Sequence, residues 1–402
     1  MEVRGLKTSS ITHMKLKILI IGAGMYVCGR GTDGFGTVLP SLYESFRSGL
    51  IEKVWVVATS QKSVQAVVRK NKELSGRLGF ALPLEGFPSR GAASYKDALQ
   101  KIRPDAVVVA VPDHLHAAVV RDVAKAGAHV LVVKPLAPTV KEGRSMIAAC
   151  RKSNVYGAVE FHKRFDEANL KLRDVIATGQ IGDVLYVNVA YSQRKLIPEN
   201  MFSSWAAKTN IFQYLGVHYV DLIYFATGAK PVRALATAQK SWLIKKGINT
   251  YDAVQVVIEW QHPKTKKIFT SLIVTNWIDP NTSSAMSDQK ISVVGTQGRV
   301  DSDQKNRGVQ IVSDEHGIED FNPYFSQIYT DATGQTIFRG YGERSFHQFF
   351  ADVSNIKVGN QTPADLKDLR PTFEQGLVST AVIDAVTTSL KIKSAWVNVV
   401  SI

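Results

Sequence analysis

Short apolar runs alternate with amphipathic stretches over roughly the first 160 residues. The runs 17–21, 105–111 and 129–133 are rich in β-branched residues, which is typical of strands buried on both faces of a parallel sheet. The stretches 117–126 and 139–153 have the length and periodicity of helices. Strands that alternate with helices predict right-handed crossovers and a parallel, Rossmann-type sheet.

The pattern changes after residue 182, where extended segments with alternating polar and apolar positions predict a second sheet. These segments are 184–191, 232–238, 253–260, 268–277, 289–295 and 308–313. We expect this sheet to be open and mostly antiparallel, with one face covered by helices. Two later stretches, 343–355 and 373–389, predict helices that pack back on the body.

The fold prediction is therefore an α/β Rossmann-type dinucleotide-binding domain followed by an α+β domain. We place the first domain at residues 1–160 and the second at residues 161–402. The first would bind the cofactor. The second would bind the substrate, and its open sheet face could pair with a second subunit.

A glycine-rich turn follows the first predicted strand. Gly22 permits a tight turn, and Gly24 lets the backbone approach a pyrophosphate. Val27 stands where the usual fingerprint has its third glycine, and residues 25–35 are interpreted as an inserted loop. Gly36 opens the next helix and is the candidate for the displaced third glycine. A flexible turn without a ligand is the alternative for these glycines alone.

The second strand, 54–58, ends without the acidic residue that binds the ribose hydroxyls of NAD. Ser60 and Lys62 stand there instead. Hydroxyl and ammonium groups accommodate the 2′-phosphate of NADP, whereas a carboxylate would repel it. We expect NADP or NAD as the cofactor, with NADP favoured. The alternative for Lys62 is a solvated surface lysine.

Lys134, followed by a proline, ends the predicted strand 129–133. The carboxyl ends of parallel strands form the edge where open α/β sheets bind ligands, and proline stops the strand. We expect Lys134 beside the nicotinamide ring, where its amine would handle the proton of an alcohol undergoing oxidation. This role needs a pKa lowered by burial or by a cationic neighbour.

Tyr214, His218 and Asp221 are spaced i, i+4 and i+7, so on a helix they share one face. Such a face can relay protons or hold sugar hydroxyls. The alternative is a histidine that is hydrogen-bonded within the domain core. Lys163 and Arg164, at the domain junction, are candidates for contacts with substrate hydroxyl, carboxylate or phosphate groups, or else are solvated charges.

Several motifs occur in a fixed order along nearly the whole chain. They lie at residues 109–116, 126–130, 134–137, 160–166, 179–182 and 216–221. Their order and spacing resemble the glucose-fructose oxidoreductase/inositol dehydrogenase/rhizopine catabolism family. The chain departs from that family in two places. Val133 replaces the usual Glu before the Lys-Pro pair, and Tyr214 replaces an Asp that many members have four residues before the histidine.

The resemblance implies an NAD(P)-dependent oxidoreductase that acts on a sugar, cyclitol or sugar derivative. Lys134 and His218, with Tyr214, would then be catalytic, and Pro112 and His116 would contact the cofactor. Lys163, Arg164 and Asp221 would contact the substrate. The alternative is a non-catalytic dinucleotide-binding regulator. The lost acid at position 214 and the enlarged glycine loop favour the regulator, and the retention of Lys134 and His218 favours the enzyme.

Composition further limits the classes of protein to which this chain could belong. A chain of 402 residues suits two domains, and its two cysteines, Cys28 and Cys150, cannot form a disulfide framework. We expect no metal, no membrane span and no signal segment, hence a cytoplasmic protein. The net charge of +14 occurs without a nucleic-acid-reading motif. It is interpreted as a basic cleft for an anionic cofactor and substrate. We expect a homodimer or homotetramer and no nucleic-acid partner.

Overall fold

The computed structural model describes residues 14–88, 94–202 and 205–402. Its amino-terminal half contains a six-stranded sheet in the order β3-β2-β1-β4-β5-β6, and every neighbouring pair is parallel. This order confirms the predicted Rossmann-type sheet. The strands are β1 (Leu16–Ile21), β2 (Ile51–Val57), β3 (Leu84–Gly86), β4 (Ala106–Val109), β5 (His129–Val133) and β6 (Gly157–Glu160).

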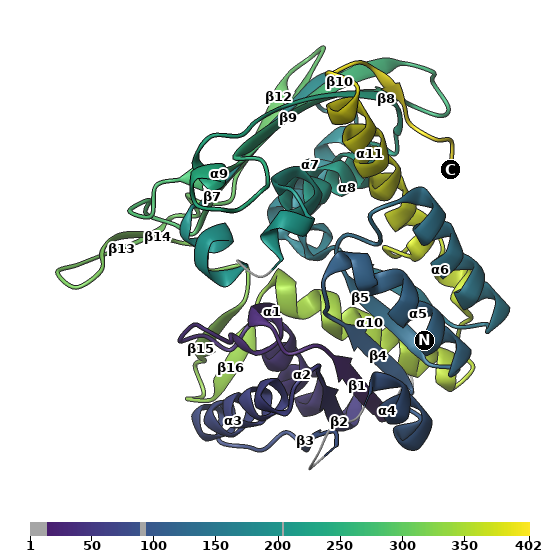
Figure 1. Ribbon diagram of the computed structural model, residues 1–402, viewed down its shortest axis with the longest axis vertical. Coiled ribbons are helices and arrows are strands. Elements are labelled where there is room, and N and C mark those ends of the chain that lie inside the picture. The colour runs from purple at the N-terminus through teal and green to yellow at the C-terminus, as the bar shows by residue number, and fades with distance from the viewer. Residues whose placement is uncertain (1–13, 89–93, 203–204) are drawn as a thin grey trace, which may run out of the picture.

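Helices connect these strands and cover both faces of the sheet (Figure 1). Because side chains alternate along a strand, β1 contributes Leu16, Ile18 and Ile20 to one hydrophobic core and Leu19 and Ile21 to another. The helices are α1 (Met25–Cys28), α2 (Val38–Arg47), α3 (Gln61–Leu78), α4 (Tyr95–Ile102), α5 (His116–Lys125) and α6 (Val140–Lys152).

The second sheet has seven strands in the order β12-β11-β7-β10-β9-β8-β17. Only the β10–β7 pair is parallel, so the prediction of a mostly antiparallel sheet is confirmed. The strands are β7 (Val184–Arg194), β8 (Lys230–Gln239), β9 (Ala253–Gln261), β10 (Ile268–Asp279), β11 (Ser287–Gly295), β12 (Arg299–Asp303) and β17 (Val397–Asn398). Figure 1 shows α7 (Glu167–Ala177), α8 (Val217–Thr227) and α11 (Phe373–Lys391) beneath one face, and α9 (Trp242–Lys245) near one end.

Two hairpins stand outside the large sheets. The predicted strand 308–313 forms as β13 (Val309–Ser313), but it pairs only with β14 (Gly317–Phe321). This hairpin extends away from the body in Figure 1. The second hairpin joins β15 (Gln327–Thr330) to β16 (Thr336–Arg339) and lies beside α2. Alternation therefore identified β13 as a strand without identifying its partner.

The carboxyl-terminal helices return to the amino-terminal half. The helix α10 (Tyr341–Lys357) packs on α2, and its Phe346 and Phe350 share a core with β1. The helix α11 packs between α6, α8 and β8. Among the described residues, no helix is long and apolar enough to cross a membrane. Within the same ranges, no group of three His, Cys, Asp or Glu side chains is placed to hold a metal ion.

Candidate active site

The turn after β1 has the geometry that a dinucleotide requires. Gly22 has a φ of +124°, and a Cβ there would lie 2.1 Å from the carbonyl oxygen of Ala110, so only glycine allows this approach. A Cβ on Gly24 would meet nothing within 4 Å, which leaves space for a pyrophosphate against the backbone. At Gly36 a Cβ would lie 2.7 Å from the carbonyl oxygens of Met25 and Tyr26. Gly36 thus lets α1 pack closely against the chain before α2.

The insert after Gly24 reaches the end of β2. Arg30 in this insert donates from Nη1 to Ser63 Oγ over 2.7 Å, and Ser63 Oγ lies 2.9 Å from Ser60 Oγ. Ser60 also caps α3 by accepting from the backbone N–H of Ser63. Lys62 is exposed at the same corner. The structure therefore brings Ser60 and Lys62 together with a cation that the sequence analysis missed, because nothing in the sequence shows where a long insert folds.

His116 supports the turn that carries Lys134. Its ring is fully buried, with Nδ1 2.9 Å from the carbonyl oxygen of Pro135 and Nε2 2.9 Å from that of Val111. Burial lowers its pKa, against the charge of Asp113. These contacts favour a supporting role over the cofactor contact expected from the sequence. Pro112 is partly exposed at the carboxyl end of β4, on the edge where a cofactor would lie.

Lys134 occupies the carboxyl end of β5 and faces Tyr214. Its Nζ donates to the carbonyl oxygen of Tyr214 over 2.6 Å and lies 3.6 Å from the centre of the Tyr214 ring. The residue remains partly exposed. Loss of hydration lowers the pKa of Lys134 to about 7, although the carboxylates of Glu160 and Asp113 act in the opposite direction. Near neutral pH this amine can therefore both accept and donate a proton.

Tyr214 lies in a π-helical turn, Phe212–Gly216, that directly precedes α8. Regular α-helical spacing was expected for Tyr214 and His218, so this turn is a difference from the prediction. Gly216 permits it, because a Cβ there would lie 2.4 Å from the ring of Phe212. Such turns occur frequently at functional sites. Here the turn presents both a carbonyl oxygen and an aromatic ring to Lys134.

His218 is buried in the first turn of α8, and its Nδ1 has no hydrogen-bond partner among the described residues. Its ring centre lies 4.8 Å from that of His162. Burial lowers the pKa of His218 well below its ordinary value, and the charges of Lys134, His162 and Lys163 lower it further. His218 is therefore a neutral imidazole beside the lysine at neutral pH.

A buried carboxylate completes this cluster. Glu160, the last residue of β6, lies within 3.0 Å of His162 Nδ1. It also accepts from the hydroxyls of Tyr26 and Ser345, over 2.9 and 2.8 Å. Glu160, His162 and Tyr26 were not predicted from the sequence as site residues. Glu160 ends a parallel strand just as the residue before Lys134 does, so the rule that selected Lys134 was available for it.

Arg164 and Asp221 pair with each other. The guanidinium donates from Nε and Nη2 to both carboxylate oxygens, over 2.8 and 2.6 Å, and from Nη1 to Gln375. Both side chains are buried. Burial raises the pKa of Asp221, and the charge of Arg164 opposes that change. This bidentate pair favours a structural role for both residues over the substrate contacts expected from the sequence.

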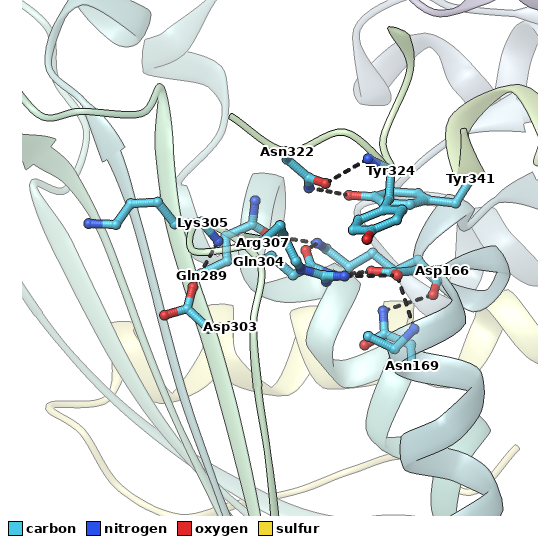
Figure 2. Close-up of polar contacts among 12 residues, drawn as sticks. Asp166, Asn169, Gln289, Asp303, Gln304, Lys305, Arg307, Asn322, Tyr324 and Tyr341 are labelled. Atoms are coloured by element: carbon cyan, nitrogen blue, oxygen red, sulfur yellow. Dashed lines mark hydrogen bonds and ion pairs between the residues drawn. The ribbon is translucent and has the colours of Figure 1, made fainter. Parts of the chain in front are cut away.

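Lys163 is held at the edge of the second sheet. Its ammonium group donates to the side-chain oxygens of Gln289 and Gln304. Burial lowers the pKa of Lys163 to about 7, and the charge of Asp166 acts in the opposite direction. Figure 2 shows Asp166 where Gln304 and Arg307 meet, and Arg307 Nη2 lies 2.8 Å from its carboxylate. Lys163 is thus enclosed by polar partners near His218, whose pKa it lowers.

Residues after β12 cover the histidine pair. The rings of Phe325 and Tyr341 lie 5.2 and 5.7 Å from that of His162. Arg307 anchors this segment to Asp166, and the ring of Tyr324 lies 5.7 Å from the Arg307 guanidinium. Figure 2 shows Tyr324 and Tyr341 on the same side of this ion pair. The covering segment limits the access of water to the site, which strengthens its electrostatic interactions.

Two family models match this chain. Residues 16–161 match an oxidoreductase family with an NAD-binding Rossmann fold. Residues 169–301 match the GFO/IDH/MocA C-terminal domain. The two matches together cover well over half of the sequence and include Gly22, Lys134 and His218. His162, Lys163 and Arg164 lie in the short segment between the two matched ranges.

Characterised relatives are distant in sequence. Inositol 2-dehydrogenase of Rhizobium meliloti (strain 1021) is 26% identical over 291 residues, which are 71% of this chain and 78% of that protein. The 1,5-anhydro-D-fructose reductase of Ensifer adhaerens is 27% identical over 203 residues, 49% of this chain. The second match covers 60% of the reductase, which is less than two thirds of its length.

The fold is shared with solved structures along nearly the whole chain. Scyllo-inositol dehydrogenase from Lactobacillus casei, solved with bound NAD(H) and scyllo-inositol, superposes with a TM-score of 0.66 at 18% identity. The superposition covers 96% of this chain and all of that one. At this level of identity the likeness is one of architecture.

Proposed function

Because this chain belongs to the GFO/IDH/MocA oxidoreductase family, we propose that it oxidises or reduces a sugar, cyclitol or sugar derivative. Hydride would pass between a nicotinamide cofactor and a hydroxyl-bearing carbon of the substrate. The observation that carries the proposal is Lys134, a partly exposed residue at the edge of the Rossmann sheet, whose amine has its pKa lowered by burial to about 7. It stands beside the neutral imidazole of His218.

The chain's own residues divide the work in this proposal. Gly22 and Gly24 would receive the pyrophosphate, and Pro112 would border the nicotinamide side. The bound cofactor supplies the hydride acceptor or donor. The Lys134 amine takes the hydroxyl proton during oxidation, and His218 orients the hydroxyl. Lys163 would contact a second polar group of the substrate through the N–H that it does not give to Gln289 or Gln304.

NADP is the cofactor that this proposal favours over NAD. Arg30, Ser60 and Lys62 gather at the end of β2, and no acidic residue stands among them. A guanidinium group is well suited to bind a phosphate, since it forms paired, charge-assisted hydrogen bonds. The alternative, a regulator that binds dinucleotide without turnover, has no need of a proton-accepting Lys134. The dehydrogenase and reductase names of the relatives also favour the enzyme.

The test of the activity is a screen of sugars, cyclitols and sugar derivatives with both cofactors, read by the absorbance of the reduced nicotinamide. Turnover with at least one polyol, abolished in Lys134→Ala, supports the proposal. Tight cofactor binding with no turnover on any of these compounds would support the regulator.

The test of the cofactor preference is a fluorescence titration with NADP⁺ and NAD⁺. We expect Arg30→Ala to weaken NADP binding about tenfold, because one charge-assisted contact is lost, and to leave NAD binding nearly unchanged. Ser60→Asp should shift the preference toward NAD. Arg77→Ala, a similar change on an exposed side chain of α3, is the matched control. Tighter binding of NAD than of NADP by the unmodified protein would contradict the preference.

A second copy of this chain is the proposed partner of the open sheet. One face of β7 and β10 carries exposed apolar side chains, among them Tyr186, Ile268 and Leu272. Large exposed apolar patches mark interaction sites. We expect a dimer or tetramer by light scattering, and we expect Leu272→Lys to shift it toward the monomer. An unmodified protein that is monomeric at micromolar concentration would contradict this.

A further inference from the structure

A row of polar side chains leads away from His218, and the roles given above to Lys134 and His218 do not use it. His162 lies beside His218, with 4.8 Å between the ring centres. His162 Nδ1 lies 3.0 and 3.1 Å from the two carboxylate oxygens of Glu160, and Tyr26 donates its hydroxyl to Glu160 Oε2 over 2.9 Å. The row therefore runs from the lysine edge toward the glycine-rich turn.

The contacts of Glu160 fix the state of His162. An ionised carboxylate can only accept hydrogen bonds, and Glu160 accepts from the hydroxyls of Tyr26 and Ser345. The His162 Nδ1 that faces it must therefore carry a hydrogen. A neutral His162 then has its lone pair on Nε2, free to receive a proton. Carboxylate–imidazole pairs of this kind orient the ring and stabilise the imidazolium.

The charges around the site act against a proton on His218, whereas a carboxylate contacts His162. Lys134 and Lys163 both act against a charged His218. Glu160 is the carboxylate that acts most strongly on Lys134, and it touches His162 directly. A proton released in the site would thus be stabilised next to Glu160, where its charge is neutralised.

We propose that His162 and Glu160 form the outgoing half of a proton relay that begins at Lys134 and passes His218. This inference rests on the proposed function. During oxidation the C–H electron pair leaves with the hydride, the O–H bond breaks, and the carbonyl forms. The hydroxyl proton goes to the neutral Lys134 amine. One ring nitrogen of His218 then takes a proton from Lys134 while the other gives its own proton to Nε2 of His162, so that His218 stays neutral and Lys134 returns to the amine. Glu160 positions His162 and balances its charge. Neither residue touches the substrate, so both act through Lys134 and His218.

The kinetic test compares His162→Asn and Glu160→Gln with the unmodified protein. We expect kcat to fall about 10- to 100-fold, at the lower end of what proton-transfer groups contribute. KM for the polyol and the cofactor should stay within about threefold, because no substrate contact is lost. Added imidazole should raise the rate of His162→Ala several-fold and leave the rate of Lys134→Ala unchanged. Tyr341→Phe keeps the ring beside His162 and is the matched packing control.

A second test does not depend on activity, so it still decides the matter if a variant folds poorly. Histidine ¹⁵N chemical shifts of the unmodified protein should show His162 with its hydrogen on Nδ1. Glu160→Gln should abolish this preference, because an amide can donate as well as accept.

The outcomes separate the two proposals. If the unmodified protein turns over a polyol and both variants match its kcat, the relay is wrong and the proposed function stands. A hydrogen found on Nε2 of His162 would also overturn the relay. If the unmodified protein reduces no cofactor with any polyol, the proposed function fails and the relay fails with it.

Discussion

At the scale of single residues, loss of hydration affects the pKa values of this site more than neighbouring charges do. Lys134 has two carboxylates acting to keep it charged, yet loss of hydration brings its pKa to about 7. The same effect keeps His218 neutral. A lysine that can lose its proton and a histidine that cannot gain one therefore stand side by side. Under the proposed function, Lys134 would therefore take the proton and His218 would orient the hydroxyl.

The three residues of this arrangement should differ in importance. We expect Lys134→Ala to lower kcat about 10²- to 10⁴-fold, since it removes the acid/base group. His218→Asn should lower kcat less, because it removes an orienting group. Tyr214→Phe should have the smallest effect, since the ring and the carbonyl oxygen that contact Lys134 remain. Steady-state kinetics on the three variants test this order.

Cofactor titration is the control for these variants, and all three should bind cofactor nearly as the unmodified protein does. A His218→Asn loss equal to or greater than the Lys134→Ala loss would make histidine the principal acid/base group and contradict the assignment.

The pH dependence follows from the sign of the Lys134 shift. Lys134 accepts a proton only when neutral, so kcat/KM for oxidation should rise with pH and level off above about pH 7. The Asp113 carboxylate raises the pKa of Lys134. Asp113→Asn should therefore move this limb to lower pH. Rate profiles of the two proteins test this, and a limb that moves to higher pH would show that another group governs it.

The residues that sequence reasoning found are those with a rule attached to their position. Lys134 follows the end of a parallel strand, and this position alone selected it. The i, i+4 spacing of Tyr214 and His218 left a core histidine as the alternative, and the family resemblance together with Lys134 favoured the site. Glu160 obeys the strand rule as well, but the sequence showed no partner for it. Arg30 had no signal, because its role depends on the path of an inserted segment.

At the scale of elements, one buried ion pair ties the start of the second domain to α8. Arg164 lies in the turn after β6, and Asp221 lies in the middle of α8. Almost the whole of α8 is buried, so this helix has no polar face through which water could hydrate Asp221. The carboxylate depends on Arg164 for its hydrogen bonds. The pair thereby fixes the helix that begins with His218.

Breaking the ion pair between Arg164 and Asp221 should lower the stability of the folded protein. We expect Asp221→Asn to lower the free energy of unfolding by about 3–5 kcal/mol, because it leaves a buried guanidinium without its counter-charge. Asp174→Asn removes the partner of Lys171 in an exposed pair on α7 and should cost less than about 0.5 kcal/mol. Urea denaturation of both variants gives the comparison, and equal losses would mean that burial does not set the value of the Arg164 pair.

Most elements were predictable because each carries its own pattern, but their pairing was not. The strand β13 illustrates the difference. Its alternation is as clear as that of β9, yet β13 forms a hairpin outside the large sheet and leaves Val312 largely exposed. Pairing depends on which partners lie nearby after folding, and this information is absent from a single strand. The π-helical turn before α8 was not predicted either, because a single glycine, Gly216, is not a specific signal for such a turn.

At the scale of the whole molecule, the two halves share their cores. One buried apolar cluster runs from Leu19 in β1 through Leu377 in α11 to Ile258 in β9. The helix α10 belongs to the other cluster, with Phe350 against the even-numbered residues of β1. The division at residue 160 therefore separates two sheets along the sequence, whereas the packing joins them. Pattern in the sequence predicted both sheets and two late helices that pack back on the body, but it did not show which core each helix joins.

The packing of α10 predicts a distant effect. We expect Phe350→Ala to destabilise the parallel sheet, since removing a fully buried Phe costs about 3–5 kcal/mol. Hydrogen exchange should accelerate in β1 and α2, which are distant in sequence. Leu369→Ala changes an exposed side chain and serves as the control. Acceleration confined to α10 itself would contradict the shared core.

The position of α10 in the sequence also affects how the protein folds during its synthesis, because this helix is made long after the sheet on which it packs. All six strands of the parallel sheet have been synthesised when translation reaches residue 160, whereas α10, which shares a core with β1, begins only at Tyr341. At roughly 5–20 residues per second, translation needs about 10–40 s to reach it. Throughout that interval the apolar side chains of β1 lack their final cover, so the nascent chain should recruit chaperones until α10 emerges. Ribosomes stalled on either side of residue 357 would show whether chaperone release coincides with it.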